Sequence, residues 1–172
     1  MTLSPAANFL SSADVVSFWA EGLYGGGVRD LWKALDPELR LAIAQAYILR
    51  SDGPPDDRAA TALAARDSQD WHFKKMITEV SWSWRRVYVG LSDGVVFPEE
   101  AMRVGADMEH VAAYGREGAG SAQTGEWAKP HSFITRYNDG YGWLIVATGR
   151  KLPIPGWPPT EWTIPQLRKI PG

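Results

Sequence analysis

The sequence predicts an α+β domain, with helices in its amino-terminal half and antiparallel strands that end in a late hairpin. Apolar residues recur at helical spacing through much of the stretch between residues 13 and 75. Near the other end, runs of β-branched and aromatic residues flank Asp139 and Gly140, a pair typical of a two-residue hairpin loop because both loop positions need positive φ. With 172 residues the chain can bury its own core, so we expect one domain over residues 1–172.

The amino-terminal half is expected to form four helices. The first, over residues 13–24, has an N-cap in Ser11 or Ser12, and three consecutive glycines end it because glycine loses the most entropy in a helix. Asp36 suits the N-cap of a later helix, and Pro37 suits its first position. The four predicted helices cover residues 13–24, residues 28–35, the stretch from Pro37 to a turn at 51–57, and residues 58–75.

Strands are expected in the second half of the chain. The period changes over residues 79–91: Val87, Val89 and Leu91 alternate with other residues, which is typical of a half-buried strand, and Trp82 and Trp84 alternate just before them. The turn pair Asp93 and Gly94 then leads into a further strand at 95–97. The stretch 98–114 fits a helix by its residue types and a strand by its alternation, so these patterns leave both structures open.

The hairpin predicts which side chains face the helices. Counting outward from Asp139 and Gly140 predicts the pairs Asn138 with Tyr141, Arg136 with Trp143, Ile134 with Ile145, and Phe133 with Val146. The face that turns toward the helices then carries His131, Phe133, Thr135 and Tyr137. The outer face carries Arg136, Trp143 and Ile145.

The last segment, residues 150–172, contains six prolines. Proline cannot donate a hydrogen bond to a strand ladder, so this segment is not a central strand. We expect a stiff tail that docks on the domain through residues such as Trp157 and Trp162. The alternative is a polyproline ligand for the aromatic groove of a partner.

Composition argues against several classes of function. The chain has 18 basic and 20 acidic residues and a net charge of −2, so neither nucleic acid nor a membrane is an expected partner. It has no cysteine, and Asp67, Asp70 and His72 do not share one helix face, so no metal site is expected. The first 25 residues lack a basic region and a continuous apolar run, so we expect no signal peptide and a cytoplasmic protein.

Two stretches carry a family resemblance. They read FWAEGLYGGGVRDLWKALDPELRLAIAQAYI, and FITRYNDGYGWLIVATG followed by LPIPGWPP. Over about 90 of the 172 residues the chain resembles the NTF2-like superfamily, in particular its SnoaL-like and small actinobacterial members. The resemblance implies a strongly curved, cystatin-like sheet that wraps the helices into a cone with a pocket at its open end. It also favours a strand over residues 107–114.

Enzymes of that superfamily often use an aspartate–histidine pair or an aspartate–arginine–aspartate set, and neither set matches positions here. The sequence therefore leaves open whether the protein is an enzyme, and no cofactor is expected. If chemistry occurs, His131 is the candidate general acid or base, because imidazole transfers protons near neutral pH. The alternative for His131 is a histidine at the start of a strand, bonded to a nearby backbone carbonyl.

The nine tryptophans fit either a core of bulky side chains or an aromatic-lined cavity. We expect a small-molecule-binding domain with an apolar, aromatic-lined pocket. The candidate ligand-binding residues are Tyr137, Tyr88, Phe133, Trp71 and Tyr47. The alternative function is a non-enzymatic interaction module whose outer sheet face binds a second copy, giving a homodimer.

Overall fold

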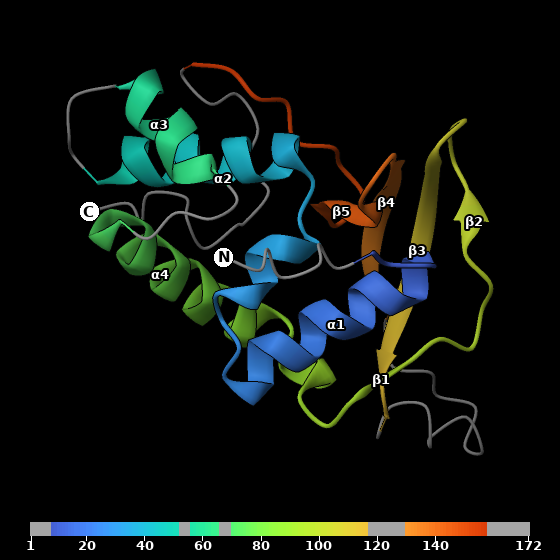
Figure 1. Cartoon of the computed structure of the whole chain (residues 1–172). Coiled ribbons are helices and arrows are strands. Elements are labelled where there is room, and N and C mark those ends of the chain that lie inside the picture. Colours follow the sequence, from blue (N-terminus) through green and yellow to red (C-terminus); the bar gives the residue numbers. More distant parts are fainter. Residues whose placement is uncertain (1–7, 52–55, 66–69, 117–129, 158–172) are drawn as a thin grey trace, which may run out of the picture.

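The protein is described from a computed structural model, and the description covers residues 8–51, 56–65, 70–116 and 130–157. Within these residues, helices precede the strands of one antiparallel sheet, so the predicted α+β class is confirmed (Figure 1). The helical elements are α1 (Ser12–Gly25), η1 (Asp30–Ala34), α2 (Pro37–Arg50), α3 (Asp57–Ala64), α4 (Trp71–Val87) and η2 (Val89–Leu91). The strands are β1 (Val95–Val96), β2 (Met102–Arg103), β3 (Met108–Gly115), β4 (His131–Asn138) and β5 (Gly142–Thr148).

The sheet has the strand order β1-β3-β4-β5, with β2 also paired to β3. The short strands bind opposite ends of β3: Val96 pairs with Tyr114, and Met102 pairs with His110. The strand expected over 107–114 is thus confirmed as β3, and the strand expected at 95–97 as β1. α1 contacts all three long strands, and the curved sheet bends around it (Figure 1).

Aromatic rings fill the space between α1, α4 and the sheet. Trp19 of α1 packs in T-shaped contact with Trp84 of α4, at 5.4 Å between ring centroids, and with Phe133 of β4, at 5.3 Å. All three side chains are buried. Among the described residues, three of the nine tryptophans, Trp19, Trp32 and Trp84, are buried in the core, where such rings contribute large apolar areas.

A small polar network holds the first turn of α1 to the sheet. Ser11 is the N-cap, and its side chain accepts a hydrogen bond from the Asp14 backbone N–H at 3.1 Å. Ser12 donates a short hydrogen bond to the carboxylate of Glu109, and Thr135 donates to the Ser12 hydroxyl at 2.9 Å. Because Ser12 and Thr135 are buried, this network fixes where the helix crosses the sheet.

The register predicted for the late hairpin is wrong. The observed partners are Asn138 with Gly142, Tyr137 with Trp143, Arg136 with Leu144, and Thr135 with Ile145, one residue away from the prediction. The loop is one residue longer because Gly142 adopts a positive φ of 72° beside the carbonyl of Phe9. A bulge between Ile134 and Thr135 shifts the register by one more residue.

The corrected register rearranges the two faces of the sheet. Tyr137 now packs against Trp143, with 5.8 Å between ring centroids, and Ile145 is fully buried. Arg136 instead reaches the start of α2, where its Nη1 lies 3.2 Å from Glu38 and 3.8 Å from Asp36. The predicted outer face of Arg136, Trp143 and Ile145 therefore does not exist as a free surface.

The predicted helix at 58–75 is wrong in part, and the predicted strand at 87–91 is wrong, because Val87 ends α4 and Val89–Leu91 form η2. Two helices, α3 and α4, occupy the first range, and Asp70 caps α4 by accepting a hydrogen bond from the His72 backbone N–H at 2.7 Å. α4 then continues to Val87, through residues predicted to be extended. Its buried residues recur at helical spacing, and packing that face on the core outweighs the local alternation: Phe73, Met76, Ile77, Val80 and Trp84.

Two segments from the amino-terminal half form parallel bridges to β5. Phe9 bridges to Gly142, and the Trp143 backbone N–H donates to the Phe9 carbonyl at 3.0 Å. Leu35 bridges to Ile145, and the Ile145 carbonyl accepts a hydrogen bond from the Asp36 backbone N–H at 2.8 Å. β5 is thereby bound along both sides.

The described part of the proline-rich segment runs along α2. Pro153 is buried, and the Gly156 backbone N–H donates to the side-chain oxygen of Gln45 at 3.0 Å. Gln45 is itself buried, and its amide nitrogen donates to Asp57 at 3.1 Å. The remainder of the predicted docked tail, with Trp162, lies outside the described residues. Among the helices described, none has the length and apolar character needed to cross a bilayer.

Candidate functional site

A hollow of about 500 Å³ lies between the end of α2, α3 and the first turns of α4. We call it the helical pocket. Apolar and aromatic side chains supply most of its wall: Tyr47, Ile48, Ala59, Ala62, Leu63 and Trp71. Polar side chains complete it: Ser51, Asp56, Asp70, His72 and Lys75. Its size and apolar lining are typical of small-molecule sites.

Helix caps set the walls of the helical pocket. Asp56 accepts hydrogen bonds from the Arg58 and Ala59 backbone N–H groups at 3.0 and 3.2 Å and so begins α3. Asp70 begins α4 in the same way. Both carboxylates that line the pocket are therefore engaged in starting a helix.

Trp32 of η1 contacts both α3 and α4. Its indole N–H donates to the carbonyl of Ala64 at the end of α3, at 3.4 Å. Its ring packs in T-shaped contact with Phe73 of α4, at 5.5 Å between ring centroids. Because Trp32 is fully buried, these contacts connect the end of α3 to α4 through the core.

The aromatic groups of the helical pocket differ in exposure and charge environment. Tyr47 is buried. Its burial, and to a smaller extent the nearby negative charge of Glu79, raise the pKa of its hydroxyl, which stays neutral at physiological pH. Trp71 is 65% exposed, its ring flanked by His72 at 5.2 Å and by the Lys75 ammonium at 5.8 Å. The mouth of the pocket therefore presents an exposed indole and a cation.

Such a site can bind the apolar body of a small molecule and orient a polar end. The Tyr47 hydroxyl and the Lys75 ammonium are the groups suited to that orientation. Among the described residues, no group of three histidine or acidic side chains could hold a metal ion, and Asp67 lies outside those residues.

The predicted catalytic residue lies elsewhere, at the start of β4. The His131 ring packs 5.1 Å from Tyr88, which lies 5.6 Å from Phe133 and 5.1 Å from Trp19 between centroids. The Tyr88 hydroxyl donates to the carbonyl of Thr148 at 3.2 Å. The buried rings of Trp19, Tyr88 and Phe133 fill the interior of the fold, with the half-buried His131 at its edge. None of His131, Tyr88 and Phe133 lines the helical pocket.

Burial affects the protonation of this cluster. Burial lowers the pKa of the His131 imidazole below its usual value, which favours the neutral form. Burial also raises the pKa of the Tyr88 hydroxyl, partly offset by its hydrogen bond to Thr148. Both groups are therefore neutral near pH 7, and each packs against a neighbouring ring.

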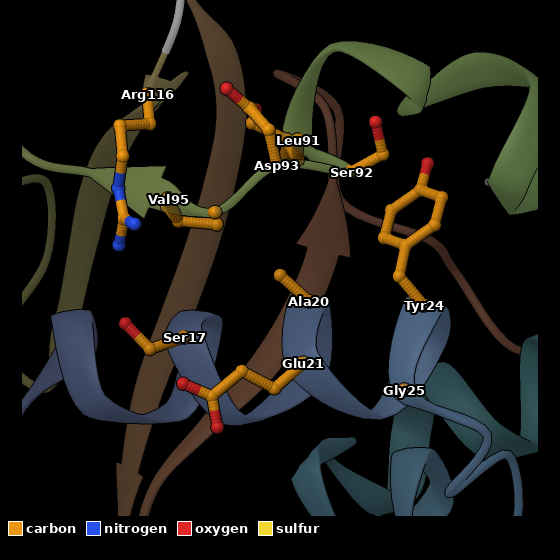
Figure 2. A pocket seen from close by; sticks show the side chains of 11 residues that line it. Ser17, Ala20, Glu21, Tyr24, Gly25, Leu91, Ser92, Asp93, Val95 and Arg116 are labelled. Carbon is orange, nitrogen blue, oxygen red and sulfur yellow. The ribbon is translucent and has the colours of Figure 1, made fainter.

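A second hollow, also of about 500 Å³, is more polar (Figure 2). Ser17, Glu21 and Tyr24 of α1 form one wall, and the turn at 91–95 forms the other. Arg116 enters from the end of β3 (Figure 2). The Tyr24 hydroxyl donates to the Arg85 carbonyl at 3.0 Å, and burial raises the pKa of Tyr24 to about 12, against a smaller opposing effect of the Arg85 charge.

Gly94 makes room for Arg116 in this second hollow. Gly94 has a φ of 119°, and a Cβ there would lie 3.1 Å from the guanidinium of Arg116. Because Glu21 and Arg116 both line this hollow, its walls carry charges of both signs. None of the predicted ligand-binding residues lines it.

The predicted site residues thus fall in three places. Tyr47 and Trp71 meet at the helical pocket, and Tyr88 and Phe133 join His131 in the filled interior. Tyr137 lies apart on the hairpin, 49% exposed against Trp143.

α3 contributes pocket residues that the sequence does not predict, above all Ala59 and Leu63. A single predicted helix over 58–75 leaves no room for a pocket between two helices. The signal available was Asp70, a good N-cap directly before the bulky sequence WHF.

No family model matches the chain, and no curated protein or solved structure matches it. The arrangement of helices on a curved antiparallel sheet rests on the structure itself, and membership of the NTF2-like superfamily stays a prediction.

Proposed function

We propose that this protein binds a small, mainly apolar molecule, lipid-like or aromatic, in the helical pocket. One observation carries the proposal: Tyr47 from α2 and Trp71 from α4 face a common hollow of about 500 Å³ beside Leu63 of α3. A concave, largely apolar site with a few polar groups is the usual form of a small-molecule site.

The interior of the fold supports this choice of position. A ligand inside the cone implied by the family resemblance would have to displace the packed rings of Trp19, Tyr88 and Phe133. The helical pocket needs no such displacement, because its hollow already lies between three helices.

The polar groups favour a ligand with one polar or anionic end. Lys75 lies at the mouth and carries a positive charge, and the neutral Tyr47 hydroxyl lies within. A ligand with an apolar body could place its polar end beside Lys75. Catalysis is not part of the proposal, because His131 lies outside this pocket.

Fluorescence titration with two probes of similar shape tests the proposal. Anilinonaphthalenesulfonate carries an anionic group and phenylnaphthylamine does not. We expect both to bind, the anionic probe more tightly, and Lys75→Met to remove that difference. Trp71→Ala should weaken both by about fivefold or more, since a lost aromatic contact is worth about 1 kcal/mol or more.

A matched pair of variants locates the binding. Ala62→Trp places a bulky ring in the helical pocket from the exposed side of α3, and Ser17→Trp places the same ring in the second hollow. We expect the first variant to lose probe binding and the second to keep it. The reverse result would move the site to the second hollow and refute the proposal.

A further inference from the structure

The outward side of α4 carries a short repeat. Trp71-His-Phe-Lys-Lys and Trp82-Ser-Trp-Arg-Arg share the pattern of a tryptophan followed at the third and fourth positions by two cations. The two units are eleven residues apart, which is three helical turns to within about 20°. Both units therefore face the same direction, a relation that the change from helix to strand predicted over residues 79–91 concealed.

The two repeated tryptophans are exposed. Trp71 and Trp82 each have 65% of their surface accessible, and Val89 just beyond the helix has 63%. The other tryptophan of α4, Trp84, is buried in the core. A line of exposed indoles that does not pack on its own domain is the usual mark of an interaction surface.

Cations flank this line on both sides. Lys74 and Arg85 lie to one side of the tryptophans, and Lys75 and Arg86 lie to the other, by the 100° step of the helix. We call these four cations, with Trp71 and Trp82, the α4 outward face.

Two features place the cations of the α4 outward face. Nε of Arg85 donates to the carbonyl of Leu23 at 2.7 Å, which holds its guanidinium in place. A hollow of about 460 Å³ opens between Trp82, Arg85, Arg86 and Val89, large enough for a phosphate-bearing group.

The nearby acidic groups do not neutralise this surface. Glu79, the one acidic residue within α4, lies one turn after Lys75 on the same flank and near Tyr47, whose pKa its charge raises, so the face carries four cations against one carboxylate. Asp70 caps the start of the helix. Although the whole chain has a net charge of −2, this face is locally basic.

We propose that the α4 outward face binds the surface of a membrane that contains anionic lipids. Tryptophan is favoured at the boundary between headgroups and acyl chains, and each lysine or arginine near an anionic surface contributes about 1 kcal/mol. α4 runs along one side of the molecule (Figure 1), and its first turns meet α3 at the helical pocket. The attachment is peripheral, since no described helix could span a bilayer.

Lipid fits this surface better than nucleic acid or a second copy. The repeated tryptophans are about 16 Å apart along the helix, with Thr78 between them, so successive bases could not stack on adjacent rings. A symmetric contact between two copies would bring four cations against four cations.

Vesicle co-sedimentation of the full chain tests the proposal. We expect binding to vesicles of phosphatidylcholine with about one third phosphatidylglycerol, and at least about tenfold weaker binding to phosphatidylcholine alone. Binding to the anionic vesicles should fall several-fold between low and high salt, because charge attraction is screened.

Paired variants identify the face. Trp82→Ala combined with Arg86→Glu removes one exposed ring and reverses one charge outside the helical pocket, and should weaken vesicle binding about tenfold or more. Met102→Ala combined with Arg103→Glu makes the same kind of change on the exposed β2 strand, and should leave binding within about twofold. Probe binding in the helical pocket should survive both, so the two proposals can fail separately.

Four outcomes would overturn the inference. The wild-type chain fails to sediment with anionic vesicles, or the two double variants lose binding equally. A single-stranded oligonucleotide binds through Trp82 and Arg86 while vesicles do not, which would assign the face to nucleic acid. A dimer seen by sedimentation equilibrium disappears in the Trp82 and Arg86 variant without vesicle binding, which would assign the face to a second copy.

Discussion

Gly142 lies so close to Phe9 that a Cβ at position 142 would sit 2.2 Å from the Phe9 carbonyl oxygen. Gly142 also has a φ of 72°, a conformation that side chains with a Cβ rarely adopt. The close approach of two distant backbone segments thus depends on the missing side chain.

Replacing Gly142 by alanine should lower the free energy of unfolding by about 2–4 kcal/mol, because the conformational cost adds to a backbone clash. Gly140 is the matched control. It has a φ of 85° but open space around its missing Cβ, so Gly140→Ala should cost about 1 kcal/mol. Urea unfolding measures both, and equal losses would show that the contact with Phe9 does not matter.

Buried and exposed tryptophans predict effects on stability of very different size. Trp19→Ala removes a buried ring that packs on Trp84 and Phe133, and should cost about 3–5 kcal/mol. Trp82→Ala removes an exposed ring, and should change stability by less than about 0.5 kcal/mol. Thermal and urea unfolding check both values, and a large loss at Trp82 would mean that its ring packs on the domain.

The buried hydrogen-bond network at the start of α1 predicts a loss of stability when one of its donors is removed. Thr135→Val keeps the shape but removes the donor to Ser12, and should cost about 1–2 kcal/mol. Thr61→Val is the control, because Thr61 bonds only within its own helix at an exposed position. Comparable losses in the two variants would refute a special role for the network.

His131 predicts a pH dependence of stability. Because burial lowers its pKa in the folded protein, the unfolded chain takes up a proton first as the pH falls below about 6.5. The contribution to stability is therefore complete above that pH and is lost as the pH falls toward the folded pKa. The slope stays below about 1.4 kcal/mol per pH unit, the limit for one proton, because solvent screens a half-buried group.

Denaturant unfolding between pH 5 and 8 measures this slope. His131→Gln should flatten it, and His72→Gln, at an exposed position, should not. A slope that survives in His131→Gln would have to come from other groups.

The sequence best predicts the helix starts and turns that are determined by residues close together in the chain. Asp36 and Pro37 begin α2, Ser11 caps α1, and Gly94 forms the turn before β1, as their local chemistry requires. Single helical or extended segments of this kind depend on interactions within a few residues.

The wrong predictions concern features that are determined by residues far apart in the sequence. The register of the hairpin depends on Gly142 meeting Phe9, more than 130 residues earlier in the chain. α4 continues as a helix through an alternating stretch because Val80 and Trp84 are buried by other elements. Trp71 and Tyr47 were predicted as ligand residues, but the hollow between them depends on α3, which the sequence pattern merged with its neighbour.

The bridges from Phe9 and Leu35 to β5 have a consequence for biogenesis. β5 leaves the ribosome late, and its backbone groups stay open until the beginning of the chain returns to cover them. An uncovered edge strand is a template for pairing with other molecules. A chain trimmed of its first ten residues would lose one of these two covers and gain a route to aggregation.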